Sequence, residues 1–546
     1  MKKQTDIQTQ NQKLYEKYKD FIIASFQVLK KYLEDGESVP EKIKEHISIK
    51  DNGSVGTYHR PEPMFYMFIN QHEEEIKQLP QYDSLIKWRL QEDPIINKFQ
   101  GRVTDSSGNI VKNPKKSAIQ FFFETNAIEF LAKFIKRTKS FNFNDEIFSK
   151  CFQEYEDSLY SKEYRFNSFS PLNNFQCEAD EIDLGEDLKL RKYSNREIED
   201  WWHRLSESKI LHHFPIPIYE IRNLKYFIEM SYIIKKGEPI SDQLPMETFN
   251  KVISALRIFK SGIVGFDMLY STELMWSDMG IIAGGGLYRK SFFGTQYKLM
   301  TLDIEGFKKF WNEFKDIEGK HDFLERAIRR FNYAYERERS DDKLIDYMIA
   351  FEALFSEAPG DIGHKLSSRA AKLLEKDFDQ RKEIYDIMKE GYNHRSTFAH
   401  GKHAKPVQFK SYLFSWDEVP GNDSGRLIEF LKQNYGIDWA KTAKIDKIDN
   451  DKTIRVSTEK NCLSLKLNPE KTKVNLIINN SKANEFIVEM KNGKLNLYKS
   501  QKIPLTEFVP MIEELLRRSI KEVIIEVMDP KVKTQKDLLD RIDFVR

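Results

Sequence analysis

The spacing of apolar residues changes several times along this 546-residue chain, and these changes limit the folds that it can adopt. Apolar residues recur at helical spacing from the start to about residue 160, and again from about 303 to 440. Runs rich in β-branched and aromatic residues mark the part between them, and polar and apolar residues alternate from about residue 446. We therefore expect an α+β multidomain protein with a helical N-terminal region (1–160), a β-rich middle domain (161–302), an all-α helical bundle (303–440) and a small α+β C-terminal domain (441–546).

Individual elements can be assigned within the first two regions. Helices are expected over 14–33, 119–136 and 246–259, strands over 214–221 and 226–234, and a loop over 51–63. Gly284, Gly285 and Gly286 follow in the middle region. A glycine triplet can cradle a phosphate, but no Lys-Ser or Lys-Thr pair follows in the spacing of a phosphate loop. We therefore expect a hairpin turn or a bulge here, and a nucleotide-dependent hydrolase has little support.

The last region predicts an antiparallel meander followed by mixed elements. The strands are TIRVS, LSLKL, KVNLII, EFIVEM and KLNLY, and the turns between the later strands are NPEK, NNSKAN and KNG. A helix over 505–518, a strand KEVIIEV over 521–527 and a last helix near Asp537 are expected to complete the domain.

Composition excludes several classes of protein. The chain has 87 Lys and Arg against 85 Asp and Glu, a net charge of +2, so any nucleic-acid site must be a local patch. Apolar residues at 40% and aromatic residues at 13% exclude a largely disordered chain. The three cysteines, Cys151, Cys177 and Cys462, form no metal-binding or disulfide spacing. Without a signal peptide or an apolar run of about 18 residues, we expect a cytoplasmic protein with no membrane span.

The third region contains four expected helices, over 323–339, 340–355, 362–374 and 380–400. Ser340 and Asp341 are expected to cap the second helix, and Gly401 gives the fourth a stop signal.

Three charged residues lie on the apolar faces of these helices. They are Glu352 on the second, Arg369 on the third and Arg395 on the fourth. An unpaired charge facing a core is costly, so we expect Glu352 to meet Arg369, Arg395 or both. An interior ion pair that only fixes helix register would explain these charges as well as a functional site does.

Arg395 is followed by His400, which is expected in the last turn of the fourth helix. A histidine of near-neutral pKa can act as general base on a ribose 2′-hydroxyl or as general acid on the leaving 5′-oxygen, and an arginine can hold the phosphate. This pair suffices for metal-free RNA cleavage, to which DNA would be inert. Five positions rotate a helix by about 140°, so the two groups converge most readily between two copies across a two-fold axis.

The surroundings of this pair are locally basic. Between 389 and 410 there are five Lys and Arg, namely Lys389, Arg395, Lys402, Lys405 and Lys410, against one acid, Glu390. Tyr392, Lys402, His403 and Lys405 are candidate RNA contacts, although a solvated face with core aromatics would have the same composition. A zinc site of His394, His400 and His403 is disfavoured, because the spacing is not that of a zinc motif.

Three runs in this region together resemble a known family. DDKLIDYMIAFEALF (341–355), HKLSSRAAKLL (364–374) and YNHRSTFAHGK (392–402) look like the HEPN domain of the ApeA-like group. HEPN proteins are helical ribonucleases and nucleic-acid-associated modules of prokaryotic defence and toxin systems. Their signature is Arg, four to six residues, then His, and here four residues separate Arg395 from His400. The resemblance covers about 315–435, and more loosely 165–315.

The resemblance implies that Arg395 and His400 are the catalytic pair of a homodimeric ribonuclease that needs no metal or cofactor. It implies that Glu352 and Arg369 support the bundle, and Ser396 fits the polar position that follows the arginine. His394 is a further candidate supporting residue. The function that follows is an antiphage or abortive-infection endoribonuclease that acts on RNA when a phage-derived or cellular trigger is present. The alternative is a non-catalytic HEPN scaffold that dimerises and senses or binds RNA.

Overall fold

The computed structural model describes residues 9–93, 116–207, 221, 224–235, 243–266, 268–273, 280–284, 295–317, 319–357, 360–399, 407–435, 437–459, 461–471, 473–478, 481–491 and 494–544. The chain is a mixed α+β protein with several sheets and a helical stretch around 301–399, so the expected fold class is confirmed in outline. It divides into two compact units, Met1–Ile253 with Gly262–Lys308, and Ser254–Ser261 with Lys309–Arg546.

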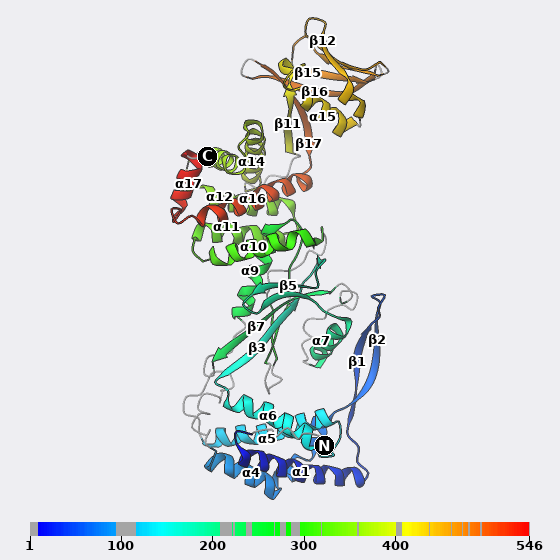
Figure 1. The fold of residues 1–546 in the computed structure, drawn as a ribbon, viewed down its shortest axis with the longest axis vertical. Helices are drawn as coiled ribbons and strands as arrows, with labels where there is room; N and C mark the ends of the chain where they lie inside the picture. Colours follow the sequence, from blue (N-terminus) through cyan, green and yellow to red (C-terminus); the bar gives the residue numbers. More distant parts are fainter. Residues whose placement is uncertain are drawn as a thin grey trace, which may run out of the picture. The chain divides into compact units, whose positions relative to one another are not determined.

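The first unit begins with a group of helices, labelled in part in Figure 1. They are α1 (Gln12–Glu34), α2 (Phe65–Gln71), α3 (Glu73–Lys77), α4 (Pro80–Gln91), α5 (Lys116–Thr138) and α6 (Asp145–Tyr160). The two helices predicted here correspond to α1 and α5, and aromatic side chains fill much of the shared core. A charged pair lies inside that core: Arg89 Nε is 2.8 Å from Asp93 Oδ2, and both side chains are buried.

A two-stranded hairpin interrupts these helices, and it corrects the prediction of a loop over 51–63. Strand β1 (Glu41–Ile49) pairs antiparallel with β2 (Val55–Pro63). The Asn-Gly sequence at 52–53 supplies a turn in which Gly53 has a φ of +78°. The prolines at 61 and 63 are unfavourable inside a sheet. Both strands of a two-stranded sheet are edge strands, however, and proline is tolerated in an edge strand.

A six-stranded antiparallel sheet follows in the order β5-β6-β7-β3-β8-β9. Its strands are β3 (Glu163–Pro171), β5 (Glu181–Gly185), β6 (Leu188–Lys192), β7 (Tyr226–Lys235), β8 (Met268–Glu273) and β9 (Gly280–Gly284). Strand β7 confirms the prediction over 226–234, and Gly284 ends β9, whereas Gly285 and Gly286 lie outside the described residues. Most of the strand predicted at 214–221 also lies outside them, and Ile221 is helical. Short strands β4 (Phe175–Cys177) and β10 (Tyr297–Leu299) pair separately.

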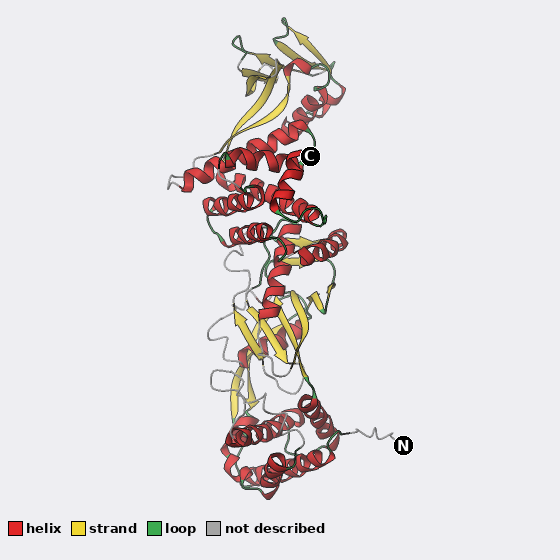
Figure 2. Ribbon diagram, turned by 90° about the vertical axis from the view of Figure 1, so that its left-hand side faces the viewer, coloured by secondary structure: helices red, strands yellow, loops and turns green. Residues whose placement is uncertain are grey.

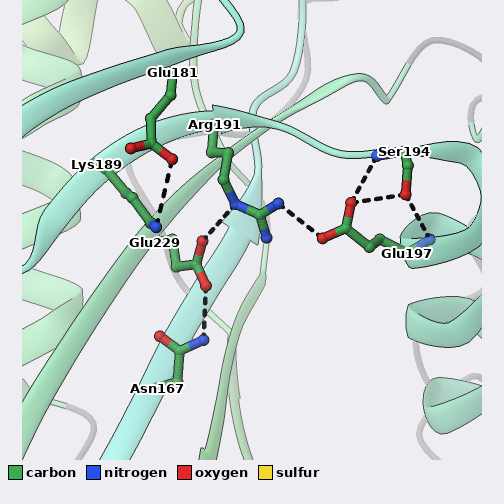
Figure 3. Close-up of polar contacts among 7 residues, drawn as sticks. All are labelled: Asn167, Glu181, Lys189, Arg191, Ser194, Glu197 and Glu229. Atoms are coloured by element: carbon green, nitrogen blue, oxygen red, sulfur yellow. Dashed lines mark hydrogen bonds and ion pairs between the residues drawn. The ribbon is translucent and has the colours of Figure 1, made fainter.

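Helix α7 (Asn195–Glu207) is fixed to this sheet by the polar network of Figure 3. Ser194 and Glu197 form a capping box at the start of the helix, in which the Ser194 N–H and hydroxyl donate to Glu197 Oε2, each at 2.8 Å. Arg191 on β6 donates to Glu197 at 2.7 Å and to Glu229 on β7 at 3.0 Å. The start of α7 is therefore held at a defined place beside the sheet.

The helices of the second unit form a bundle. Helix α9 (Gln243–Phe259) and helix α10 (Thr301–Ile317) each cross the boundary between the units. They are followed by α11 (Asp322–Glu336), α12 (Ser340–Phe355), α13 (Ile362–Leu374) and α14 (Phe378–Ala399). These bounds confirm the helices predicted in this region. The predicted capping does not hold at α12, because Arg339 takes the cap position without a side-chain hydrogen bond.

After α14 the chain leaves the bundle and forms a seven-stranded antiparallel sheet in the order β11-β17-β16-β15-β14-β13-β12. The strands are β11 (Val407–Ser415), β12 (Lys444–Ile448), β13 (Thr453–Ser457), β14 (Cys462–Leu467), β15 (Lys473–Ile478), β16 (Ser481–Lys491) and β17 (Lys494–Ile503). Helix α15 (Ser424–Tyr435) and two short 3₁₀ turns lie between β11 and β12. The predicted meander is confirmed from β13 to β17.

The chain then returns to the bundle, which corrects the prediction of a strand over 521–527. Those residues end α16 (Leu505–Val527), a helix that packs on α11, α12, α13 and α14. Ile520, Val523, Ile524 and Val527 are buried at helical spacing, and this packing overrides their preference for strands. Helix α17 (Gln535–Phe544) packs on α12, α13 and α16. Figure 1 labels α12, α16 and α17 near the C-terminal end, and Figure 2 shows that end beside helices.

Among the helices that the structure describes, none combines the length and apolar composition that crossing a bilayer requires.

Candidate functional site

The helix that carries Arg395 is held closely against two neighbours by a glycine. Gly391 on α14 is buried, and a Cβ at this position would lie 2.9 Å from Ile512 Cδ1 on α16 and 3.2 Å from Met348 Sδ on α12. A larger residue would push these side chains away. The absence of a side chain at 391 therefore allows α14 to approach α12 and α16 one turn before Arg395.

Arg395 and Glu352 form an ion pair between α14 and α12. The Arg395 Nη2 lies 3.1 Å from Glu352 Oε1 and also donates a hydrogen bond to Oε2 at 3.1 Å. The two side chains are 27% and 22% exposed, so the pair is neither fully buried nor freely solvated. This contact confirms the prediction that the charge on the second helix meets a charge on a neighbouring apolar face.

Burial raises the pKa of Glu352, and the positive charge of Arg395 opposes that rise without cancelling it. Among the described residues, Glu352 is the only hydrogen-bond partner of the Arg395 guanidinium. The guanidinium carbon also lies 5.8 Å from the centre of the Tyr392 ring. Within the described residues, Nε and Nη1 of Arg395 make no hydrogen bond.

Arg369 does not join this pair. Its Nε and Nη2 donate to Asp543 Oδ2 on α17 at 3.1 and 2.8 Å, and its Nη1 donates to the Phe355 carbonyl at 2.6 Å. Of the pairings expected for Glu352, only the one with Arg395 is present. Arg369 instead links α13 to the end of α12 and to the last helix of the chain.

His394 lies on the side of α14 that faces α16. Its ring centre is 5.9 Å from that of Phe398 and 6.4 Å from that of Phe508, and its Nδ1 is buried with no hydrogen-bond partner in the described part of the chain. Burial lowers the pKa of His394, while the charge of Glu390 acts in the opposite direction. His394 is therefore neutral at neutral pH and packs as an aromatic residue.

The remaining candidates divide into described and undescribed residues. Ser396 and Tyr392 are partly buried on α14, and the Tyr392 ring covers Gly363, whose added Cβ would lie 2.8 Å from the Tyr392 Cδ1. Helix α14 is described to Ala399. His400, Lys402, His403 and Lys405 lie outside the described residues. The structure thus places one member of the predicted catalytic pair.

Sequence reasoning missed a different constellation in the first unit. His46, Glu62 and His203 bring three potential ligand atoms within 4.8 Å of one another. They come from β1, β2 and α7 and match no short motif. The Asn-Gly turn that joins the two strands was a local signal for the proximity of His46 and Glu62, and it carries no information on His203.

Comparisons of the chain with protein-family models, with curated proteins and with solved structures find no match.

Proposed function

We propose that this chain is a metal-independent endoribonuclease of the HEPN type, with Arg395 and His400 as its catalytic pair. The observation that carries the proposal is a guanidinium on an otherwise apolar helix face, partly open to solvent and anchored on one side by Glu352. His400 follows it by five positions. The corresponding fold proposal is a HEPN bundle in the helical part of 303–440, which ends at Ala399, because β11 (Val407–Ser415) corrects the expectation that this whole range is helical.

The pairing of Arg395 suits phosphate binding. Glu352 fixes the position of the guanidinium through Nη2, and the N–H groups of Nε and Nη1, which point in different directions, can each donate to a phosphate oxygen. A planar fork that is already oriented loses less conformational freedom when it binds an anion than a free arginine does. Arg395 would thereby stabilise the negative charge that develops on the phosphorane-like transition state.

His400 would perform the proton transfers. As general base it takes the proton of a ribose 2′-hydroxyl, whose oxygen attacks the adjacent phosphorus while the bond to the 5′-oxygen breaks. A protonated imidazole returns a proton to that leaving oxygen. The products are a 2′,3′-cyclic phosphate and a 5′-hydroxyl, and no water or metal ion enters the step. We propose that the two groups come from two copies of the chain in a homodimer.

The biological role proposed is antiphage defence or abortive infection, in which cellular RNA is cleaved after a phage-derived or cellular trigger is sensed. The regions outside the bundle are the natural place for such sensing.

The alternative is a non-catalytic HEPN scaffold that dimerises and binds RNA. One observation favours it: the Glu352 carboxylate already neutralises Arg395, as it would in an ion pair that only fixes helix register. The two functions differ in what the removal of His400 does. A scaffold keeps its biological activity in a His400→Ala variant, whereas a ribonuclease loses it.

Labelled RNA incubated with the purified protein in EDTA tests the catalytic assignment. The unaltered protein should cleave the RNA, and Arg395→Ala and His400→Ala should each reduce the rate by at least about 100-fold, the usual contribution of a general acid–base group. Arg326→Ala and His364→Ala, at exposed positions on α11 and α13, are matched controls that should retain the rate. Equal cleavage by all five proteins would overturn the proposal.

Mixing the two inactive variants tests whether two copies share a site. In an equal mixture of Arg395→Ala and His400→Ala, half of the dimers are mixed, and each mixed dimer has one intact shared site. Activity should then recover to about one quarter of the unaltered rate. No recovery would show that both groups act within one chain or that copies do not exchange.

A further inference from the structure

The first unit contains a basic pocket whose chemistry is separate from that of the bundle. Its volume is about 780 Å³, and it lies between the β1–β2 hairpin, the start of α2, α5 and α7. Five cationic side chains line it, Lys44, Arg60, Lys133, Lys136 and Lys139, against the acids Glu62 and Asp200. Such a surplus of positive charge favours an anionic ligand.

Three side chains converge at one wall of this pocket. The His46 Nε2 lies 3.2 Å from Glu62 Oε1, and the His203 Nε2 lies 3.7 Å from the same oxygen. The two imidazole rings stack with their centres 4.6 Å apart. Glu62 and His203 also line the pocket, so the point on which the three ligand atoms converge is next to its interior.

Separate contacts hold the strands and the helix that carry these residues together. The Ile49 N–H at the end of β1 donates to Glu199 on α7 at 2.6 Å, and the Asn195 amide donates to the Ile49 carbonyl at 3.3 Å. Ile47 is buried in the same apolar cluster as Trp201. The capping box of α7 and its bonds to Arg191 fix the other side of the helix (Figure 3). The strands and the helix that carry the three residues are therefore held together without the help of a bound ion.

Two of the three spacings among the ligand atoms are close to those of a metal site. Zinc binds imidazole nitrogen and carboxylate oxygen at about 2.0–2.2 Å, so neighbouring ligands of a tetrahedral ion are about 3.3–3.6 Å apart. The two distances to Glu62 Oε1 lie close to that range. The His46 Nε2 is also buried without a hydrogen bond in the described part of the chain, despite its closeness to Glu62. Hydrogen bonding therefore does not explain the convergence of these atoms.

We propose that His46, Glu62 and His203 bind one divalent transition-metal ion of the zinc class. Two imidazoles and one carboxylate supply three of the four ligands of a tetrahedral ion, as in zinc sites that keep one open position. That position faces the basic pocket, where water or the phosphate group of a small ligand would complete the coordination. The inference concerns the first unit alone and does not rest on the proposed ribonuclease activity.

Lys44 is the feature that opposes metal binding. Its Nζ lies 2.9 Å from Glu62 Oε2, the carboxylate oxygen that does not face the histidines. Burial alone would raise the pKa of Glu62, but the hydrogen bond and charge of Lys44, with smaller effects of His203 and His46, lower it. The nearby ammonium repels a cation, so its removal should strengthen metal binding.

Equilibrium dialysis of the full chain without a histidine tag, against Zn²⁺ or Co²⁺, tests the proposal. The unaltered protein should retain about one ion per chain, and Co²⁺ should show the visible absorption of a site with nitrogen ligands. His46→Gln, Glu62→Gln and His203→Gln should each weaken binding by at least about tenfold. Mg²⁺, which prefers oxygen ligands, should not compete. Retention that is unchanged in all three variants would overturn the proposal.

Two further variants separate a metal site from a cluster of ion pairs. Lys44→Met should bind Zn²⁺ more tightly than the unaltered protein by several-fold, because it removes the competing cation. His59→Ala removes an exposed histidine of the same hairpin and should bind normally. Thermal unfolding in EDTA should show that each variant is folded before its metal binding is measured. A Lys44→Met protein with no gain in affinity would indicate that the carboxylate serves Lys44 alone.

Discussion

Removing Arg395 should destabilise the contact between α12 and α14 by an amount that depends on pH. In an Arg395→Ala variant, the Glu352 carboxylate loses its counter-ion. Exposed ion pairs contribute about 0.2–1 kcal/mol, whereas removing one partner of a fully buried pair costs about 3–5 kcal/mol. Because these side chains are 27% and 22% exposed, the expected loss after allowance for solvent screening is about 1–2 kcal/mol at neutral pH.

The pH dependence follows from the direction of the Glu352 pKa. Burial raises it, and the loss of the Arg395 charge should raise it further. A carboxyl group with a higher pKa in the folded state binds its proton more tightly there. This tighter proton binding stabilises the folded state fully when the pH is below the pKa of the carboxyl group in the unfolded chain, about 4.3. The stabilisation is lost as the pH rises through the pKa of the group in the folded chain. The destabilisation of Arg395→Ala should therefore be largest near pH 8 and smaller near pH 5.

Hydrogen exchange of peptides from α12 and α14, corrected for the intrinsic pH dependence of exchange, measures this local stability. A Glu352→Gln/Arg395→Ala double variant lacks the unpaired carboxylate and should lose the pH dependence. Arg326→Ala, which removes an exposed arginine of α11, should leave both helices unchanged. The same loss at pH 5 and pH 8 in Arg395→Ala would refute the assignment of the cost to an ionised Glu352.

Three further predictions concern stability elsewhere. Asp93→Ala removes the carboxylate that pairs with the buried Arg89, so the N-terminal helices should lose about 3–5 kcal/mol of stability. Hydrogen exchange of α4 measures this loss, and a loss below about 1 kcal/mol would contradict the prediction. Gly262→Ala places a Cβ 2.8 Å from the Tyr297 Cα at a φ of +140°, so the melting temperature should fall; no fall would contradict the prediction. Truncation before α17 removes Asp543, the carboxylate partner of Arg369, and should increase hydrogen exchange in α13. Exchange in α4 should not change and serves as the control.

The elements that the sequence predicted well are those whose signal is local. Most of the strands over 453–498 alternate between polar and apolar residues, so these strands carry their own evidence. Residues 521–527 were assigned wrongly because their β-branched composition was given more weight than their helical spacing. The hairpin at 41–63 was missed because the composition of residues 51–63, which contain its turn and its second strand, was interpreted as that of a loop.

The candidate site was predictable to the extent that it depends on helix faces. The position of Glu352 on an apolar stripe predicted an ion pair, and the structure selected Arg395 from the two partners proposed. The partner of Arg369 is Asp543, which lies 174 positions away on a helix that the sequence assigned to a different region. No periodicity connects such residues, because only the packing of α17 onto the bundle brings them together.

The return of α16 to the bundle has a consequence for how the chain is made. Helices α11 to α14 leave the ribosome first, and the helix that packs against Gly391 follows only after the whole seven-stranded sheet has been translated. The strand pair β11–β17 then brings both ends of the inserted sheet back together. A nascent chain released early therefore lacks one of the helices against which α14 packs. Under the proposed ribonuclease function, this order of synthesis would withhold activity until translation is nearly complete.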